Sequence, residues 1–217
     1  MIAMVLATTI AAHAYTCVNF RSGDPTVLLK EAKTTFEVDW DNARVSNWDN
    51  VLWPKYLEKR GDDFVRDWPE DRVKVETYFV VQFNRRSDFL EVPFDGDPVE
   101  YRMILRINKI DVGNGSGMFN PFGSAKSGGV IIDGTIEIRS IDGKLLCVLN
   151  VEEAKGVGHM SETVRIGLTM TTIAGDMNDF IKDVKKGRVE ATPVEEDTTA
   201  SIPTKQVVGD PIKNAPK

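Results

Sequence analysis

Residues 130–151 read VIIDGTIEIRSIDGKLLCVLNV, and this stretch contains two apolar runs on either side of Asp142-Gly143. The first run repeats at every second position, at Val130, Ile132, Gly134, Ile136 and Ile138. An Asp-Gly pair between two such runs is a strong indication of a two-residue hairpin loop. We therefore expect residues 130–138 and 145–151 to form neighbouring antiparallel strands with one face in the core.

A third strand of the same kind precedes this pair. Tyr101, Met103, Leu105 and Ile107 would share one face, while Arg102, Arg106 and Asn108 would occupy the other. Farther upstream, residues 36–40 alternate in the same way. These runs predict an α+β fold with a mainly antiparallel sheet of about four to six strands.

Two or three helices are expected to pack on this sheet. Trp53-Pro54 is typical of a helix start, and Gly61 would end that helix. The segment Trp68–Arg86 alternates like a strand, but Pro69 suits a first helical position, and the acidic start and basic end suit the helix dipole. We interpret it as a helix.

The last helix has the clearest pattern. Apolar residues recur at steps of three and four from Ile166 to Val184, opposite a polar face to which we assign Arg165, Thr172, Asp176, Asp179, Asp183 and Lys186. Ser161 is the predicted N-cap and Gly187 the predicted stop. A stripe of this width predicts packing on the sheet.

The chain divides into three parts by composition. Residues 1–14 resemble a signal peptide, because Met1–Ala12 is an uncharged apolar run and small residues stand at Ala12 and Ala14. Residues 15–187 form one predicted domain, and 188–217 form a predicted disordered tail without apolar periodicity. This organisation predicts export to the periplasm or the extracellular space.

Two cysteines would remain after processing. An oxidising compartment would allow Cys17 and Cys147 to pair, but the alternation around Cys147 favours a buried free thiol. Lipidation at Cys17 is the alternative to soluble export, although Tyr15 and Thr16 fit that signal poorly. Contact with a membrane is expected only if Cys17 is lipidated.

Charge and loop composition exclude several partners. A net charge of -6 and a pI near 5.1 argue against nucleic acid, whose binding depends on clustered Lys and Arg. Gly113, Gly115 and Gly117 follow a strand, but no predicted helix begins beyond them to complete a phosphate site. We therefore expect no nucleotide partner.

Several motifs are similar to an uncharacterised family of small exported bacterial proteins. They are Tyr56–Gly61, Asp63–Glu70, Phe83-Asn84, Ile110–Gly113, Gly134–Ile138 and Glu162–Gly167. The resemblance spans about Gly23 to Lys186 and implies a fold without an activity. The architecture is also distantly similar to the α/β domain of envelope assembly lipoproteins, the penicillin-binding-protein activators and the curli-secretion group, which implies binding and assembly.

The sequence offers little for catalysis. His159 is the only histidine beyond the predicted leader, and no G-x-S-x-G elbow occurs. One histidine and two distant cysteines lack zinc-ligand spacing, and Asp39 and Asp41 are not followed by further calcium ligands. We predict no metal, no cofactor and no enzymatic activity. A hydrolase using acidic side chains on the exposed sheet face is the alternative.

Two features favour binding. Loop 113–128 has an apolar tip formed by Met118, Phe119, Pro121 and Phe122, which would either contact a protein partner, another subunit or a membrane, or fold back over the sheet edge. Trp40, Trp48, Trp53 and Trp68 cluster within 29 positions and would either fill the core or stack on glycans. The expected function is that of a non-enzymatic envelope binding or assembly module, which acts on a protein partner or self-associates.

Overall fold

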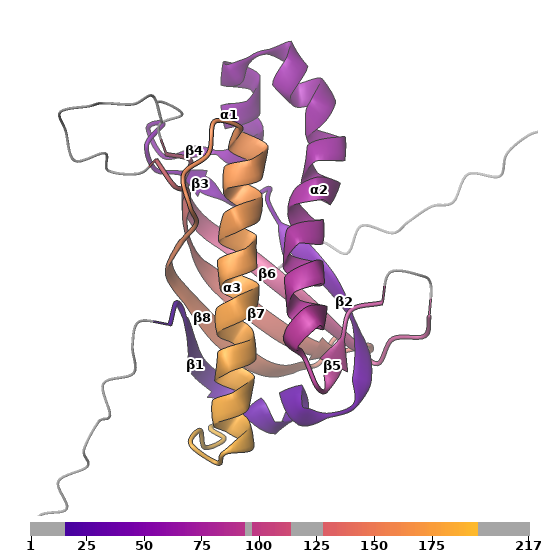
Figure 1. Ribbon diagram of the computed structural model, residues 1–217. Coiled ribbons are helices and arrows are strands. Elements are labelled where there is room, and N and C mark those ends of the chain that lie inside the picture. Colours follow the sequence, from indigo (N-terminus) through magenta and orange to yellow (C-terminus); the bar gives the residue numbers. More distant parts are fainter. Residues whose placement is uncertain (1–15, 94–96, 114–127, 195–217) are drawn as a thin grey trace, which may run out of the picture.

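The computed structural model describes residues 16–93, 97–113 and 128–194 (Figure 1). The strands are β1 (Val18–Gly23), β2 (Ala32–Asp39), β3 (Arg44–Val45), β4 (Val51–Leu52), β5 (Leu90–Glu91), β6 (Tyr101–Asp111), β7 (Ile131–Ser140) and β8 (Leu145–Lys155). The helices are α1 (Trp53–Arg60), α2 (Asp62–Arg86) and α3 (Glu162–Lys185), and a short 3-10 helix covers Pro25–Leu29. The α+β class predicted from the sequence is confirmed.

The sheet is mixed, so the prediction of a mainly antiparallel sheet holds only in part. Its order is β1-β8-β7-β6-β2-β5, with β3 paired to both β6 and β4 off this path. The neighbours from β1 to β6 are antiparallel, whereas β2 runs parallel to both β6 and β5, and β3 runs parallel to β6. The reason is the connection between β2 and β6, which contains α1 and α2. A crossover of this length lets the next strand enter in the same direction.

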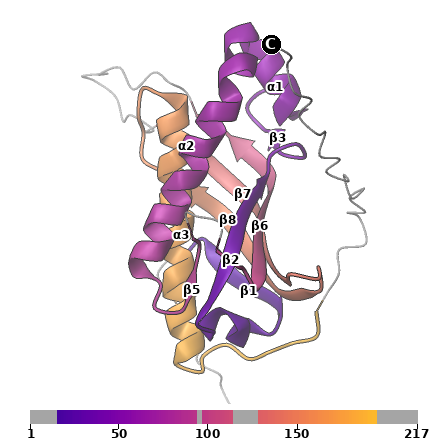
Figure 2. The same ribbon diagram turned by 90° about the vertical axis from the view of Figure 1, so that its right-hand side faces the viewer.

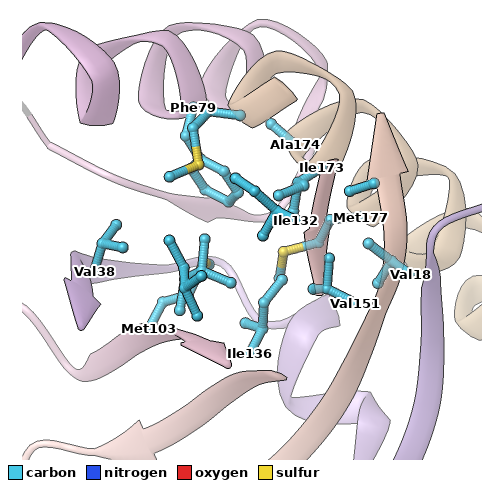
Figure 3. Packing of buried hydrophobic residues seen from close by; sticks show 14 of the residues in the cluster. Val18, Val38, Phe79, Met103, Ile132, Ile136, Val151, Ile173, Ala174 and Met177 are labelled. Carbon is cyan, nitrogen blue, oxygen red and sulfur yellow. The ribbon is translucent and has the colours of Figure 1, made fainter. Parts of the chain in front are cut away.

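The helices α2 and α3 lie on one face of the sheet. Figures 1 and 2 show them side by side against it, and Figure 2 shows that no described helix covers the opposite face. The core fills the space between the layers. Figure 3 shows Phe79 of α2 and Ile173 and Met177 of α3 facing Met103 and Ile136 of the sheet.

Helix α2 explains the ambiguous alternation of its sequence. Val75, Phe79 and Phe83 are spaced by four and are buried, while Val73, Thr77 and Val81 are also spaced by four and face solvent. Because the buried and the exposed stripe are offset by two residues, their members together occupy every second position, which is the period of a strand. The helix was predicted correctly, but it begins at Asp62, directly after Gly61, and so Pro69 lies inside it.

The hairpin and the last helix largely agree with what their sequences predict. Ser161 caps α3 by accepting a hydrogen bond from the Val164 N–H at 3.4 Å. The β7–β8 loop contains three residues instead of two, because Ser140 pairs with Lys144 and Gly143 adopts φ +92°. The bulge that accompanies it moves Leu145 out of the main core.

Residues 186–194 return to the far edge of the sheet. The Gly23 N–H donates to the Thr192 carbonyl at 3.1 Å, and the Thr192 N–H donates back at 2.9 Å. This part of the chain therefore contacts β1. The predicted signal peptide, and the rest of the predicted tail from 195 onward, lie outside the described residues.

Candidate functional site

A groove of about 410 Å³ lies between α2 and the β2 edge of the sheet. Threonine and apolar side chains form most of its lining, together with two acidic groups. The lining residues are Thr34, Thr35, Phe36, Val73, Glu76, Thr77, Val80, Val92, Pro93, Asp97 and Val99. The Phe36 ring stacks on Phe79 of α2 with 3.9 Å between centroids, which anchors the floor of the groove to the core.

The main chain of β2 is open toward this groove. Strand β5 pairs with β2 only at Ala32 and Lys33, so among the described residues no strand pairs with the outer edge beyond that point. The Lys33 carbonyl accepts from the Glu100 N–H at 2.9 Å and therefore faces β6. Main-chain groups of alternate residues point to opposite sides of a strand, so those of Thr34, Phe36 and Val38 point to the outer edge.

A bond from α2 agrees with this orientation. Nη2 of Arg72 donates to the Val38 carbonyl at 3.2 Å, at the end of the open edge. Nε of Arg72 donates to Glu76 at 2.7 Å, and Glu76 also accepts from Nε1 of Trp40 at 3.1 Å. At the other end, Asp97 pairs with Lys33. The groove's two acidic groups are therefore engaged, which leaves main-chain groups and apolar shape for recognition.

A second groove adjoins the first on the outer face of α2. It measures about 460 Å³ and lies between α2 and α3, lined by Val73, Lys74, Thr77, Tyr78, Val81, Gln82 and Thr171. Val73 is 62% exposed and lines both grooves, whereas Val81 is 51% exposed and lines only this one. Exposed apolar side chains that flank adjacent hollows are typical of a contact surface.

The structure packs the four tryptophans mainly as core. Trp40 and Trp53 are buried, and the ring of Trp68 lies 5.0 and 4.8 Å from theirs. Trp48 is half-buried against Tyr56, at 5.1 Å. The faces of Trp40 and Trp53 are therefore inaccessible to a sugar, and only parts of Trp48 and Trp68 reach the surface.

The apolar tip Met118, Phe119, Pro121 and Phe122 lies outside the described residues. The start of its loop is bound by Arg165, whose predicted position is wrong. Arg165 was assigned to the polar face of α3, but it is only 3% exposed. Its guanidinium donates to the carbonyls of Val112, His159 and Met160 at 3.2, 2.8 and 3.1 Å. Arg165 therefore joins the loop start to the segment before α3.

A polar cluster near the start of α3 was also missed. The Tyr56 hydroxyl donates to both oxygens of Glu162 at 2.9 Å, and Nη1 of Arg60 donates to Glu162 at 2.8 Å. Burial, followed by the negative charge of Glu162, raises the pKa of Tyr56. The spacing of Tyr56 and Arg60 by four residues was visible in the sequence, but their partner lies more than 100 positions away.

Acidic side chains on the sheet face opposite the helices are paired with arginines. Arg102 binds Glu37 through two bonds of 3.1 and 3.0 Å. Arg106 joins Asp39 at 3.2 Å to Glu137 at 2.6 Å. Burial would raise the pKa of Glu137, but hydrogen bonds from Arg106 and Arg139 outweigh it and hold that pKa below its ordinary value. A general acid needs the opposite shift.

The other catalytic and metal candidates remain apart. His159 is exposed, and its Nδ1 accepts from the Ser161 N–H at 3.0 Å. Within residues 16–93, 97–113 and 128–194, no three side chains of His, Cys, Asp and Glu gather closely enough to hold a metal ion. In the same ranges, no helix is long and apolar enough to cross a bilayer.

Both cysteines are free and buried, which confirms the prediction for Cys147. Burial, and then the charge of Asp24, raises the pKa of Cys147 to about 12. Burial, and then the hydrogen bond with Asp176, raises the pKa of Cys17. The Cys17 N–H also donates to Asp176 at 2.7 Å.

Comparison with known proteins does not assign this chain to a family. No family model and no curated protein matches it. Among solved structures, the chain is similar to the PelC dodecamer from Paraburkholderia phytofirmans, with 8% identity and a TM-score of 0.38 over 74% of this chain and 96% of that one. A single-substitution variant of the same PelC gives 10% identity and a TM-score of 0.34 over 74% and 95%. Similarity at this level does not indicate a function.

Proposed function

We propose that this chain is a non-enzymatic binding module of the bacterial envelope, which holds an extended apolar segment of a protein partner against β2. The observation that carries the proposal is the open main-chain edge of β2 beside an apolar groove. Exposed sheet edges bind extended segments by adding a strand, with main-chain hydrogen bonds for affinity and pockets for alternate side chains.

The geometry of the groove suits this mode of binding. Thr34 and Phe36 direct main-chain groups outward, and Val73 and Val80 of α2 stand beside them. A strand paired here would turn every second side chain toward α2 and the intervening ones toward the opposite side of the sheet. The partner is therefore expected to carry apolar residues at alternate positions.

The envelope location rests on the apolar leader in residues 1–14. The apolar tip at Met118–Phe122 remains a proposed second contact element. Paired carboxylates on the sheet face, and the lowered pKa of Glu137, favour binding over acid-base hydrolysis.

Selection from a peptide library tests the proposal. Peptides selected on the unaltered protein should bind Val73→Glu about tenfold or more weakly, because a charge enters the apolar wall. Val65→Glu is the matched control, since Val65 is exposed on the same helix and lines neither groove. The Val81→Glu variant shows which groove binds the peptide, because Val81 lines only the α2–α3 groove. Peptide bound beside β2 should bind this variant as strongly as the unaltered protein.

Amide hydrogen exchange provides the second measurement. Bound peptide should slow exchange at Phe36, whose N–H group would join a new ladder. Binding that is equally strong in Val73→Glu and Val65→Glu, or that leaves exchange of the Phe36 amide unchanged, would contradict the proposal.

A further inference from the structure

The outer side of α2 and α3, which faces away from the sheet, carries a strip without charge. It consists of three exposed residues spaced by four on α2 and three residues spaced by three and four on α3, intervals that keep residues on one side of a helix. Val73 and Val81 are 62% and 51% exposed, and they line one groove together with Thr171 of α3. We call the strip the helix-layer face, and its members are Val73, Thr77, Val81, Leu168, Thr171 and Gly175.

This face differs from the outer side of an ordinary surface helix, where charged side chains stand opposite the core. In the part of the chain that the structure describes, no helix or strand lies beyond α2 and α3 on this side of the sheet (Figure 2). Exposed apolar side chains beside a hollow of about 460 Å³ favour a contact surface for a macromolecule.

The charges around the face are divided between its two ends. Thr163 in the first turn of α3 bonds Asp71 of α2, and farther along both helices Asn178 bonds the Phe83 carbonyl. The two helices therefore run in the same direction. In α2, residues 62–71 contain five carboxylates and one arginine, whereas its last two residues are both arginine, and the last turn of α3 is basic as well. One end of the helix-layer face is thus acidic and the other basic.

We propose that two copies of this chain associate through the helix-layer face, with their α2 helices antiparallel across a two-fold axis. A two-fold contact uses the same surface on both copies, so that surface must be complementary to itself. An antiparallel arrangement brings the acidic end of one face against the basic end of the other, whereas a parallel one would oppose like charges. This self-complementarity favours a second copy over an unrelated partner.

The spacing along α2 fits an axis beside Thr77. Val73 and Val81 lie four residues to either side, or about 6 Å along the helix, so Val73 meets Val81 of the partner subunit. Glu70 and Arg85 lie seven and eight residues away, or about 10.5 and 12 Å, so Glu70 meets Arg85 of the partner subunit. The Glu70 side chain is 81% exposed, and among the described residues no carboxylate pairs with Arg85. Each contact occurs twice, once on each side of the axis.

Analytical ultracentrifugation of the full chain over a range of concentrations tests the proposal. The unaltered protein should show a monomer–dimer equilibrium. Val81→Glu should raise the dissociation constant about tenfold or more, because a carboxylate would be buried against Val73 of the partner subunit. Val65→Glu is the matched control, since Val65 is also exposed on α2 but lines neither groove, and it should leave the constant unchanged.

Charge reversal adds a measurement that a folding defect cannot imitate. Arg85→Glu and Glu70→Arg should each raise the dissociation constant about tenfold, because like charges then meet at two places in the dimer. Both changes in one chain should bring the constant back to within about threefold of its original value, because each copy supplies both partners of the exchanged pair.

Three results overturn the proposal: a protein that stays monomeric, a dimer that Val81→Glu does not weaken, and a double variant that associates no better than the single ones. None of Glu70, Val81 and Arg85 lines the groove beside β2, so peptide binding there should be equal in all these variants. The proposed function therefore stands or fails independently of the dimer.

Discussion

Arg165 illustrates how a charged side chain in a helical pattern can belong to the interior. Its guanidinium donates to three carbonyls in two segments that lie outside the helices and strands. Unpaired main-chain carbonyls are costly to bury, and an arginine offers five donors in a fixed plane. The residue therefore acts as a connector between the start of loop 113–128 and the start of α3.

The cysteines supply a prediction at the same scale. Burial raises the pKa of both thiols, that of Cys147 to about 12. Neither thiol should therefore react with Ellman's reagent at pH 8 in the folded protein. Two thiols should react after unfolding in urea. Fewer than two would indicate a disulfide or a modified Cys17, and rapid reaction before unfolding would contradict the burial of both.

At the scale of elements, the close contact between α2 and α3 depends on glycine. A Cβ at Gly167 would lie 2.5 Å from the Tyr78 ring, so α3 approaches α2 closely only because this residue has no side chain. Gly175, two turns later in α3, has no such neighbour, because the nearest atoms to its Cβ position are the ends of Arg86 and Gln82 at 3.8 and 3.9 Å.

This difference predicts opposite effects of one substitution. Gly167→Ala should lower the free energy of unfolding by about 1–3 kcal/mol through overpacking. Gly175→Ala should raise it by about 0.5–1 kcal/mol through helix propensity. Urea unfolding measures both, and a Tyr78→Ser change should recover part of the loss in Gly167→Ala. Two effects of the same sign would contradict the close contact at Gly167.

At the scale of the molecule, an ion-pair ladder joins three strands of the mixed sheet. Arg106 of β6 contacts Asp39 of the parallel neighbour β2 and Glu137 of the antiparallel neighbour β7. Glu137 also accepts from Arg139 at 2.7 Å. The ladder therefore crosses the place where the sheet changes from antiparallel to parallel pairing.

The ladder predicts how stability depends on pH. Because the pKa of Glu137 is lower in the folded state than its ordinary value of 4.5, its contribution is present above that value and is lost as pH falls through the folded pKa. Glu137→Gln should lower the free energy of unfolding by about 2–4 kcal/mol at pH 7, because two arginines lose a partner. In urea unfolding, the gap between the two proteins should shrink as pH falls below 4.5. A gap that stays constant with pH would contradict this role.

Local patterns in the sequence were enough to predict the elements that depend on near neighbours. The hairpin at Asp142-Gly143, the cap at Ser161 and the buried stripe of α3 each follow from residues within a few positions of one another. The helix at Trp68–Arg86 followed from its end charges, although its start was placed too late. Even the burial of Cys147 followed from its alternation with Leu149 and Val151.

Only the tertiary structure decided which elements meet. Periodicity shows that one face is buried, but it does not show what covers that face. The parallel pairing of β2, the groove between β2 and α2, and the buried position of Arg165 all join segments far apart in the chain. The sequence by itself thus determined the α+β class and the local elements, while the candidate binding groove arose because a long helical crossover returned the chain beside β2 and left its outer edge unpaired.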